Sequence, residues 1–183
     1  MKTNSVQKFR ERGLISILIL CLFFLQAEAG VRQDPEPAGN KREGELIANL
    51  FFSDRKGEFL RSENRQIPAG ESSEQTAIRI VNNLIEGPRE DLLPTLPKET
   101  KLLALFITGN GTAVVDFDPA IREKYPFGVN TERLTVYSIV NSLVLNIEAI
   151  TSVKFLLKGR ETDTLAGHWD VRQPLKANML LIR

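Results

Sequence analysis

Asp116 and Asp118 are the side chains in this sequence whose types and spacing come closest to a catalytic pair. Alternate residues of a strand point to the same side, so both carboxylates would leave the apolar run around Phe117 together. General acid–base catalysis and cation binding both use such pairs. A structural role is favoured here, because Asp118 precedes Pro119 at a strand exit, where an aspartate bonds loose backbone groups in an Asx turn.

The single histidine, His168, lies two residues before Asp170, which could orient its imidazole. A triad also needs a nucleophile on a strained turn, and the sequence has no G-x-S-x-G motif. Ser138 falls inside a predicted helix. We therefore interpret His168 as a turn residue bonded to backbone groups, and Asn141 in the same helix as a solvated or loop-bracing amide.

The remaining inventory excludes several classes of function. One Cys and one His in 183 residues are too few for a Cys/His zinc site or a disulfide framework. The segment Gly109–Val114 begins like a dinucleotide fingerprint, but it joins two predicted strands and opens no helix. With 24 basic and 23 acidic residues, the chain lacks the basic excess of a nucleic-acid binder. We expect no cofactor, no metal and no catalytic residue.

The first 29 residues indicate export. Four basic residues among the first twelve are followed by the apolar run Leu14–Leu25 and by small residues at Ala27 and Ala29. This is the pattern of a secretory signal peptide cleaved between Ala29 and Gly30. Removing residues 1–29 takes away four of the 24 basic and two of the 23 acidic residues, which leaves a net charge of −1.

Two other fates of this segment stay open. An uncleaved membrane anchor is the alternative, although twelve helical residues span only about 18 Å of a hydrocarbon core about 30 Å thick. A lipid on Cys21 is disfavoured, because Leu20 stands where lipoprotein processing requires a small residue. The predicted location is therefore extracytoplasmic, in the periplasm or cell envelope, with N-terminal anchoring as the alternative.

Beyond the signal, composition divides the chain into two parts. Residues 30–44 contain only Val31 and Ala38 as apolar residues and cannot join a core, so they are predicted to form a disordered tether. Residues 45–183 show no further linker, repeat or low-complexity stretch. They are predicted to form one domain.

Hydrophobic patterning predicts eight elements in that domain. They follow the order β-β-α-β-β-α-β-β: Leu46–Ser53, Glu58–Ile67, helix Ser72–Glu86, Thr100–Thr108, Thr112–Asp118, helix Thr131–Asn146, Ser152–Leu157 and Trp169–Leu175. Both helices have an apolar stripe that needs a sheet to cover. The predicted fold is an α+β two-layer sandwich, a mixed sheet with two helices packed on one face.

Local signals support these boundaries. Ser72 and Gln75 form a capping box, and Thr131 is placed to cap the second helix. Asn110-Gly111 between two β-branched runs indicates a hairpin. The turn Asp54–Gly57 indicates another, whose return strand has three charged residues on one side and is interpreted as a solvated edge strand: Arg61, Glu63 and Arg65.

Tyr125 and Phe127 lie in the long connection before the second helix. Aromatic side chains in a surface loop suit a protein interface. A loop that folds back over the sheet as a lid would explain them equally well.

Six ordered stretches resemble the GerMN domain, the family of sporulation and spore germination domains. They are Asn49–Asp54, Leu84–Pro88, Leu96–Leu103, Gly111–Phe117, Tyr137–Leu143 and Thr164–Asp170. The resemblance implies an extracytoplasmic, non-enzymatic α/β domain, similar to the ring-building motifs that assemble secretion channels. It brings no catalytic residue to this chain.

Together these observations predict a non-enzymatic extracytoplasmic module that binds or assembles in the cell envelope. Its expected partner is an envelope protein, a second copy of the chain or the peptidoglycan machinery, with membrane contact only through an uncleaved N-terminus. The alternative is an uncharacterised envelope hydrolase that uses His168 and the Asp116/Asp118 pair.

Overall fold

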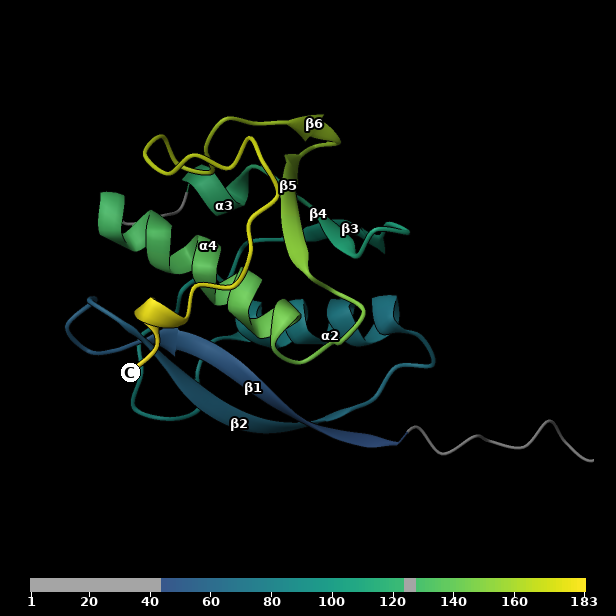
Figure 1. Ribbon diagram of the computed structural model, residues 1–183. Coiled ribbons are helices and arrows are strands. Elements are labelled where there is room, and N and C mark those ends of the chain that lie inside the picture. The colour runs from purple at the N-terminus through teal and green to yellow at the C-terminus, as the bar shows by residue number, and fades with distance from the viewer. Residues whose placement is uncertain (1–43, 124–127) are drawn as a thin grey trace, which may run out of the picture. The chain divides into compact units, whose positions relative to one another are not determined.

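The computed structural model describes residues 44–123 and 128–183. Its elements are β1 (Glu45–Ser53), β2 (Leu60–Pro68), α2 (Ser73–Glu86), β3 (Leu102–Ile107), β4 (Thr112–Phe117), α3 (Ala120–Glu123), α4 (Val129–Val144), β5 (Ser152–Leu157), β6 (Arg160–Glu161) and the 3-10 helix η2 (Met179–Leu181). The predicted α+β class is confirmed (Figure 1). The predicted signal peptide and, up to residue 43, the tether, with the cleavage site Ala29/Gly30, lie outside the described residues, and so do Tyr125 and Phe127. None of the described helices has the length and apolar character needed to cross a membrane.

The strands form two sheets. The larger is mixed, in the order β3-β4-β5-β6, with β4 and β5 parallel and the two outer pairs antiparallel. The β1–β2 hairpin was expected in this sheet but forms a separate antiparallel sheet, paired from Glu45↔Pro68 to Ser53↔Leu60. The predicted hairpins before and after α2 are both present.

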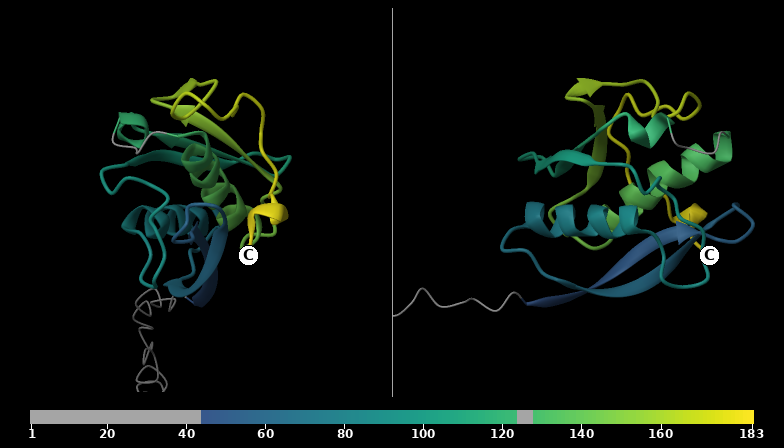
Figure 2. Two further views of the ribbon diagram at one scale, coloured as in Figure 1. Left: turned by 90° about the vertical axis from the view of Figure 1, so that its left-hand side faces the viewer. Right: turned by 180° about the vertical axis from the view of Figure 1, so that it is seen from behind.

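The two long helices lie between the sheets. α2 contacts β3, α4 contacts β5, and the helices contact each other, so both cover the same face of the four-stranded sheet, as predicted. The β1–β2 hairpin packs on the other side of the helices, which Figure 2 shows in both views. α4 is therefore enclosed from several directions, and its residues from Leu134 to Leu143 are all buried.

The helix ends follow local chemistry. The Ser72 hydroxyl accepts a hydrogen bond from the Gln75 N–H at 3.2 Å, which confirms the predicted cap of α2. The Gln75 side chain bonds the N–H of Glu71, one residue earlier than a capping box requires. Thr131 does not cap the second helix: α4 starts at Val129 after Gly128, and no side chain caps it.

The predicted last strand, Trp169–Leu175, is not formed. In place of a ladder, the segment makes isolated β-bridges, at Val153↔Leu175 and Thr164↔Asp170. The Asp170 carboxylate accepts the Arg172 N–H at 2.9 Å, a local bond that competes with a strand ladder, and Pro174 has no N–H to donate. The Trp169 ring instead packs edge-on against Tyr137, with centroids 5.8 Å apart.

Candidate interaction surface

Asp116 and Asp118 both hold backbone groups. The two carboxylate oxygens of Asp116 accept the N–H of Gly159 at 2.9 and 2.8 Å and so fix the two-residue turn between β5 and β6. Lys158 and Gly159 in that turn both have positive φ, the geometry of a tight hairpin. Asp118 accepts the N–H of Lys101 at 2.8 Å, at the entry to β3. Both carboxylates thus bond backbone groups, and Asp118 bonds the distant Lys101 N–H where an Asx turn is predicted.

His168 is oriented by a glutamate from α4. Its Nδ1 lies 3.2 Å from Oε2 of Glu132, and the same oxygen accepts the backbone N–H of His168 at 2.7 Å. The other oxygen of Glu132 accepts the N–H of Ala166, also at 2.7 Å. Glu132 is 1% exposed. This buried carboxyl therefore holds the loop 166–168 against α4, and Asp170 is not the partner of His168.

The Asp170 carboxylate pairs with Arg172 instead. The Arg172 side chain donates to both its oxygens, at 2.6 to 3.1 Å, and the Arg172 N–H donates a further bond. The side-chain bond, followed by the backbone bond, lowers the pKa of Asp170 to about 2. The carboxylate is thus kept ionised at an exposed turn.

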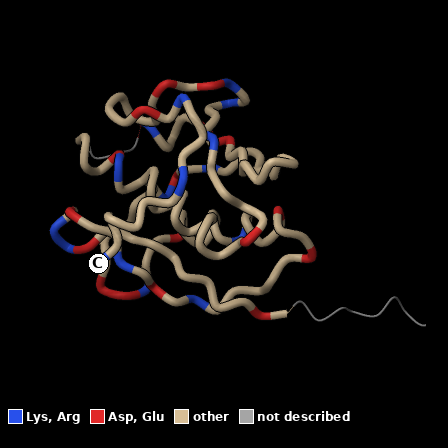
Figure 3. The backbone as a smooth tube through the Cα atoms, in the orientation of Figure 1, with Lys and Arg blue, Asp and Glu red and all other residues tan. Residues whose placement is uncertain are grey.

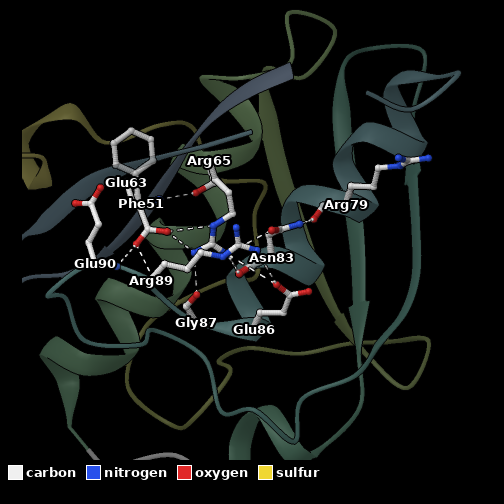
Figure 4. Close-up of polar contacts among 10 residues, drawn as sticks. Phe51, Glu63, Arg65, Arg79, Asn83, Glu86, Gly87, Arg89 and Glu90 are labelled. Carbon is white, nitrogen blue, oxygen red and sulfur yellow. Dashed lines mark hydrogen bonds and ion pairs between the residues drawn. The ribbon is translucent and has the colours of Figure 1, made fainter. Parts of the chain in front are cut away.

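A buried ion pair connects β2 to the end of α2 (Figure 4). Glu63 and Arg65 are 3% and 2% exposed, so the prediction that they face solvent is wrong. Ile67 lies on the same side of the strand and is also buried. This apolar residue was the one sequence signal that the side with Glu63 and Arg65 faces the core. Arg61 is exposed because the alternation of buried and exposed residues is interrupted at Arg61 and Ser62 and becomes regular only from Glu63 onward.

Each member of the pair also bonds backbone groups. Arg65 donates to the carbonyl oxygens of Asn83 and Gly87, at 3.2 and 3.0 Å, where the last carbonyls of α2 have no partner within the helix. Glu63 accepts the N–H groups of Arg89 and Glu90 at 2.8 and 2.9 Å. The pair therefore fixes both the C-terminus of α2 and the chain that follows it.

The ionisation of Glu63 is expected to make the fold sensitive to acid. Burial alone would raise its pKa, but the bonds from the Glu90 N–H, from Arg65 and from the Arg89 N–H together lower it below 4.5. A carboxyl with a depressed folded-state pKa stabilises the fold fully above its unfolded pKa and loses this contribution as pH falls through the folded value. Urea midpoints measured downward from pH 5 should fall less steeply for Glu63→Gln than for the wild type. Equal slopes would contradict this.

α4 closes the open edge of β1 with polar side chains. Asn146 exchanges two bonds of 2.8 Å with the N–H and C=O of Asn49. The Ser138 hydroxyl donates to the C=O of Phe51 at 2.5 Å, and the Phe51 N–H donates to the Ser142 hydroxyl at 3.1 Å. Ser138 and Ser142 are four residues apart and lie on one face of α4, and Asn146 follows in the turn just after the helix. They take the place of a neighbouring strand.

Asn141 performs the bracing role predicted for it. Its amide exchanges two bonds with the backbone of Asn178, at 2.9 and 3.2 Å, and it is fully buried. Together with Glu132, Ser138 and Ser142, it explains why polar residues occur inside a buried helix. Each satisfies backbone groups of an edge or a loop.

Replacing Ser142 by Ala is expected to lower the free energy of unfolding by about 1–3 kcal/mol, because it leaves the buried Phe51 N–H without a partner. Urea denaturation measures this loss. Ser62→Ala is the matched control, since Ser62 is exposed on β2 and should change stability by less than about 0.5 kcal/mol. Equal effects of the two substitutions would show that α4 does not stabilise the edge of β1.

A shallow groove of about 390 Å³ lies on the other face of the four-stranded sheet. Thr112 and Val114 contribute to its lining, together with Lys154 and Arg172. Lys154 donates to the Arg172 C=O at 2.5 Å and lies 3.6 Å from Glu161. Lys154 thus pairs with Glu161 and also holds the C-terminal segment on the sheet.

Three of the four sheet edges in the described residues are protected. α4 covers β1, and the backbone of β1 continues into bonds with Leu93. β2 exposes polar side chains, and Arg183 bonds its first residue, Leu60. β6 is two charged residues long. Short length, charge and cover are the devices by which proteins block edge-to-edge pairing.

The fourth edge, β3, is not protected by short length, charge or cover. Its pairing with β4 is irregular at one end only, between Leu102 and Ala104. It has no charged residue, and Leu103 and Phe106 are 50% and 49% exposed. Figure 1 shows β3 at the margin of its sheet, and Figure 3 shows basic and acidic residues interleaved along the described chain without a block of one sign. An apolar, uncharged edge strand is a surface for pairing with another strand. We call residues 102–108 the β3 edge and take it as the candidate interaction surface.

Sequence reasoning did not find this surface. An unbroken apolar run such as Leu102–Ile107 predicts a strand buried on both faces, so exposure of Phe106 had no local signal. Tyr125 and Phe127, for which an interface and a lid are equally good predictions, lie outside the described residues, and their role stays a prediction. Within residues 44–123 and 128–183, no group of three or more His, Cys, Asp or Glu side chains is placed to hold a metal ion.

The chain was compared with known protein sequences and solved structures. No curated protein sequence matches it. Among solved structures, a candidate lipoprotein from Clostridium perfringens is 25% identical with a TM-score of 0.53, and the match covers 73% of this chain and 88% of that one. The first GerMN domain of the sporulation protein GerM from Bacillus subtilis is 20% identical with a TM-score of 0.55, covering 74% and 98%. The tandem GerMN domains of GerM match with a TM-score of 0.54 and 20% identity, over 74% of this chain and 46% of the tandem.

The family model described as sporulation and spore germination matches residues 49–163, more than half of the chain. Five of the six stretches that resemble GerMN domains lie within this range, and the sixth, Thr164–Asp170, begins directly after it. The chain therefore belongs to the Germane family of sporulation and spore germination domains.

Proposed function

We propose that this protein is a non-enzymatic module of the cell envelope that binds or assembles through the β3 edge. The observation that carries the proposal is the contrast between three protected sheet edges and an apolar, uncharged fourth one. The side chains that could support catalysis instead hold backbone groups, as Asp116, Asp118 and Glu132 all do. These contacts fit a scaffold that presents a surface.

Location in the envelope is supported by two independent features. The N-terminal 29 residues have the pattern of a secretory signal, and one structural relative is a candidate lipoprotein. N-terminal sequencing of the protein from its native envelope tests this part. A chain that starts at Gly30 is expected, an intact Met1 would establish an anchor, and a lipid on Cys21 would contradict our interpretation of Leu20.

Alanine at His168 is expected to leave function intact wherever the folded protein accumulates. The two backbone bonds to Glu132 remain without the imidazole, so the loss of stability should stay below about 1 kcal/mol. The measurement compares cells that lack the protein with cells complemented by wild type or His168→Ala, at equal protein level. Full loss of function with a folded variant would favour the alternative, an envelope hydrolase.

A further inference from the structure

The β3 edge is complementary to itself. We propose that it pairs antiparallel with the β3 edge of a second copy of this chain, about a two-fold axis at Phe106. This inference rests on the proposed function and names the partner of that surface.

The unpaired backbone groups belong to Leu105 and Ile107. The Thr108 N–H donates to the Thr112 C=O at 3.0 Å, which makes this a hydrogen-bonded pair of the β3–β4 ladder. Alternation in an antiparallel ladder then turns the groups of Phe106 toward β4 and those of Leu105 and Ile107 away from it. In the described residues β3 pairs with β4 alone, so these outward groups have no strand partner.

The ladder restricts the register. Pairing with β4 is irregular between Leu102 and Ala104, which leaves residues 104–108 as the regular segment. Two such segments pair along their whole length in one register only, in which residue numbers of opposite partners add to 212. Leu105 then faces Ile107 of the second copy with both backbone groups bonded. Phe106 faces Phe106, and Ala104 faces Thr108.

The side chains in this register fit one another. The two Phe106 rings meet at the axis in a non-hydrogen-bonded pair, where side chains of opposite strands are closest. Residues 102–108 include no charge, so the two copies bring no like charges together. A foreign strand would have to supply the same apolar pattern, whereas a second copy carries it. The sequence of the edge therefore favours self-pairing.

Disulfide trapping tests both partner and register. Two variants of the full chain are prepared, and both carry Cys21→Ser. One also carries Ala104→Cys and the other Thr108→Cys, so each has a single cysteine and keeps Phe106. Opposite non-hydrogen-bonded positions lie about 4.5 Å apart between Cα atoms, within reach of a disulfide. The mixture should therefore give covalent dimers on mild oxidation.

Each form alone is its own control. Position 104 of one copy lies about 13 Å from position 104 of the other in this register, too far for a disulfide, and the same holds for position 108. Dimers that form equally in the mixture and in the separate forms would overturn the register. A mixture without dimers would overturn the pairing.

Sedimentation of the full chain gives the second readout. Phe106→Lys should weaken self-association at least about tenfold, because it removes the aromatic pair and places two like charges at the axis. Leu180→Lys is the matched control: Leu180 is 81% exposed on η2 and should leave association unchanged. Circular dichroism verifies that both variants are folded.

The outcomes separate this inference from the proposed function. A wild type that stays monomeric up to roughly 1 mM overturns self-pairing. If such a monomer crosslinks to another envelope protein through position 106, the binding module stands and only the second copy is wrong. If it neither self-associates nor crosslinks to any envelope component, both proposals fail.

Discussion

Replacing Arg65 by Met is expected to lower the free energy of unfolding by about 3–5 kcal/mol, the usual cost of removing one partner from a buried ion pair. Methionine keeps much of the side-chain volume, so the loss is mainly electrostatic. Glu63 would remain buried on β2 without its cation, and the carbonyl oxygens of Asn83 and Gly87 would lose a donor. Urea denaturation of the full chain measures the change.

Arg61→Met is the matched control for this prediction. Arg61 lies on the same strand but is exposed, and its replacement should change stability by less than about 0.5 kcal/mol. A loss below about 1 kcal/mol for Arg65→Met would show that the pair contributes little. The contacts of Figure 4 would then not be what fixes the end of α2.

Replacing Glu132 by Ala is expected to cost about 3 kcal/mol or more. The carboxyl accepts the N–H groups of Ala166 and His168 and contacts the imidazole, and hydrogen bonds to a charged group contribute about 1.5–3 kcal/mol each. Its removal also leaves a cavity between α4 and loop 166–168. The loop should lose protection from hydrogen exchange along with global stability.

Glu148→Ala provides the comparison for Glu132→Ala. Glu148 is exposed beyond the end of α4, and its loss should change stability by less than about 0.5 kcal/mol. His168→Ala should fall close to this control, since the backbone bonds survive. If His168→Ala lowered the free energy of unfolding as much as Glu132→Ala, the imidazole contact and not the backbone bonds would be the source of the stabilisation.

The parts of the fold that sequence predicts are those governed by local chemistry. Ser72 caps α2 because its hydroxyl is three residues from the N–H it bonds, and the hairpin at Asn110-Gly111 forms because its turn chemistry is local. Glu63 and Arg65 were misplaced because their partners, from Asn83 to Glu90, are 18 to 27 residues away. Charge in a strand indicates solvent unless a distant partner is known.

The exposure of the β3 edge likewise depends on parts of the chain that are distant in sequence. Phe106 and the buried Leu105 are adjacent members of one apolar run and point to opposite faces of the sheet, and only the fold shows that the helices cover the face of Leu105. From the sequence, Glu132 and Ser142 look like ordinary solvent-facing helix residues. Their roles become visible only when the loop and the strand edge that they bond are known. Strand order and edge cover are properties of the whole chain.

Crosslinking in the native envelope tests whether the protein binds through the β3 edge. A photoreactive side chain is placed at position 106 on the β3 edge or at position 62 on the exposed face of β2, in the full chain at its normal level. We expect a specific adduct from position 106, with a second copy of the chain, and none from position 62. Equal labelling from both positions, or no adduct from position 106, would contradict a binding module that acts through the β3 edge.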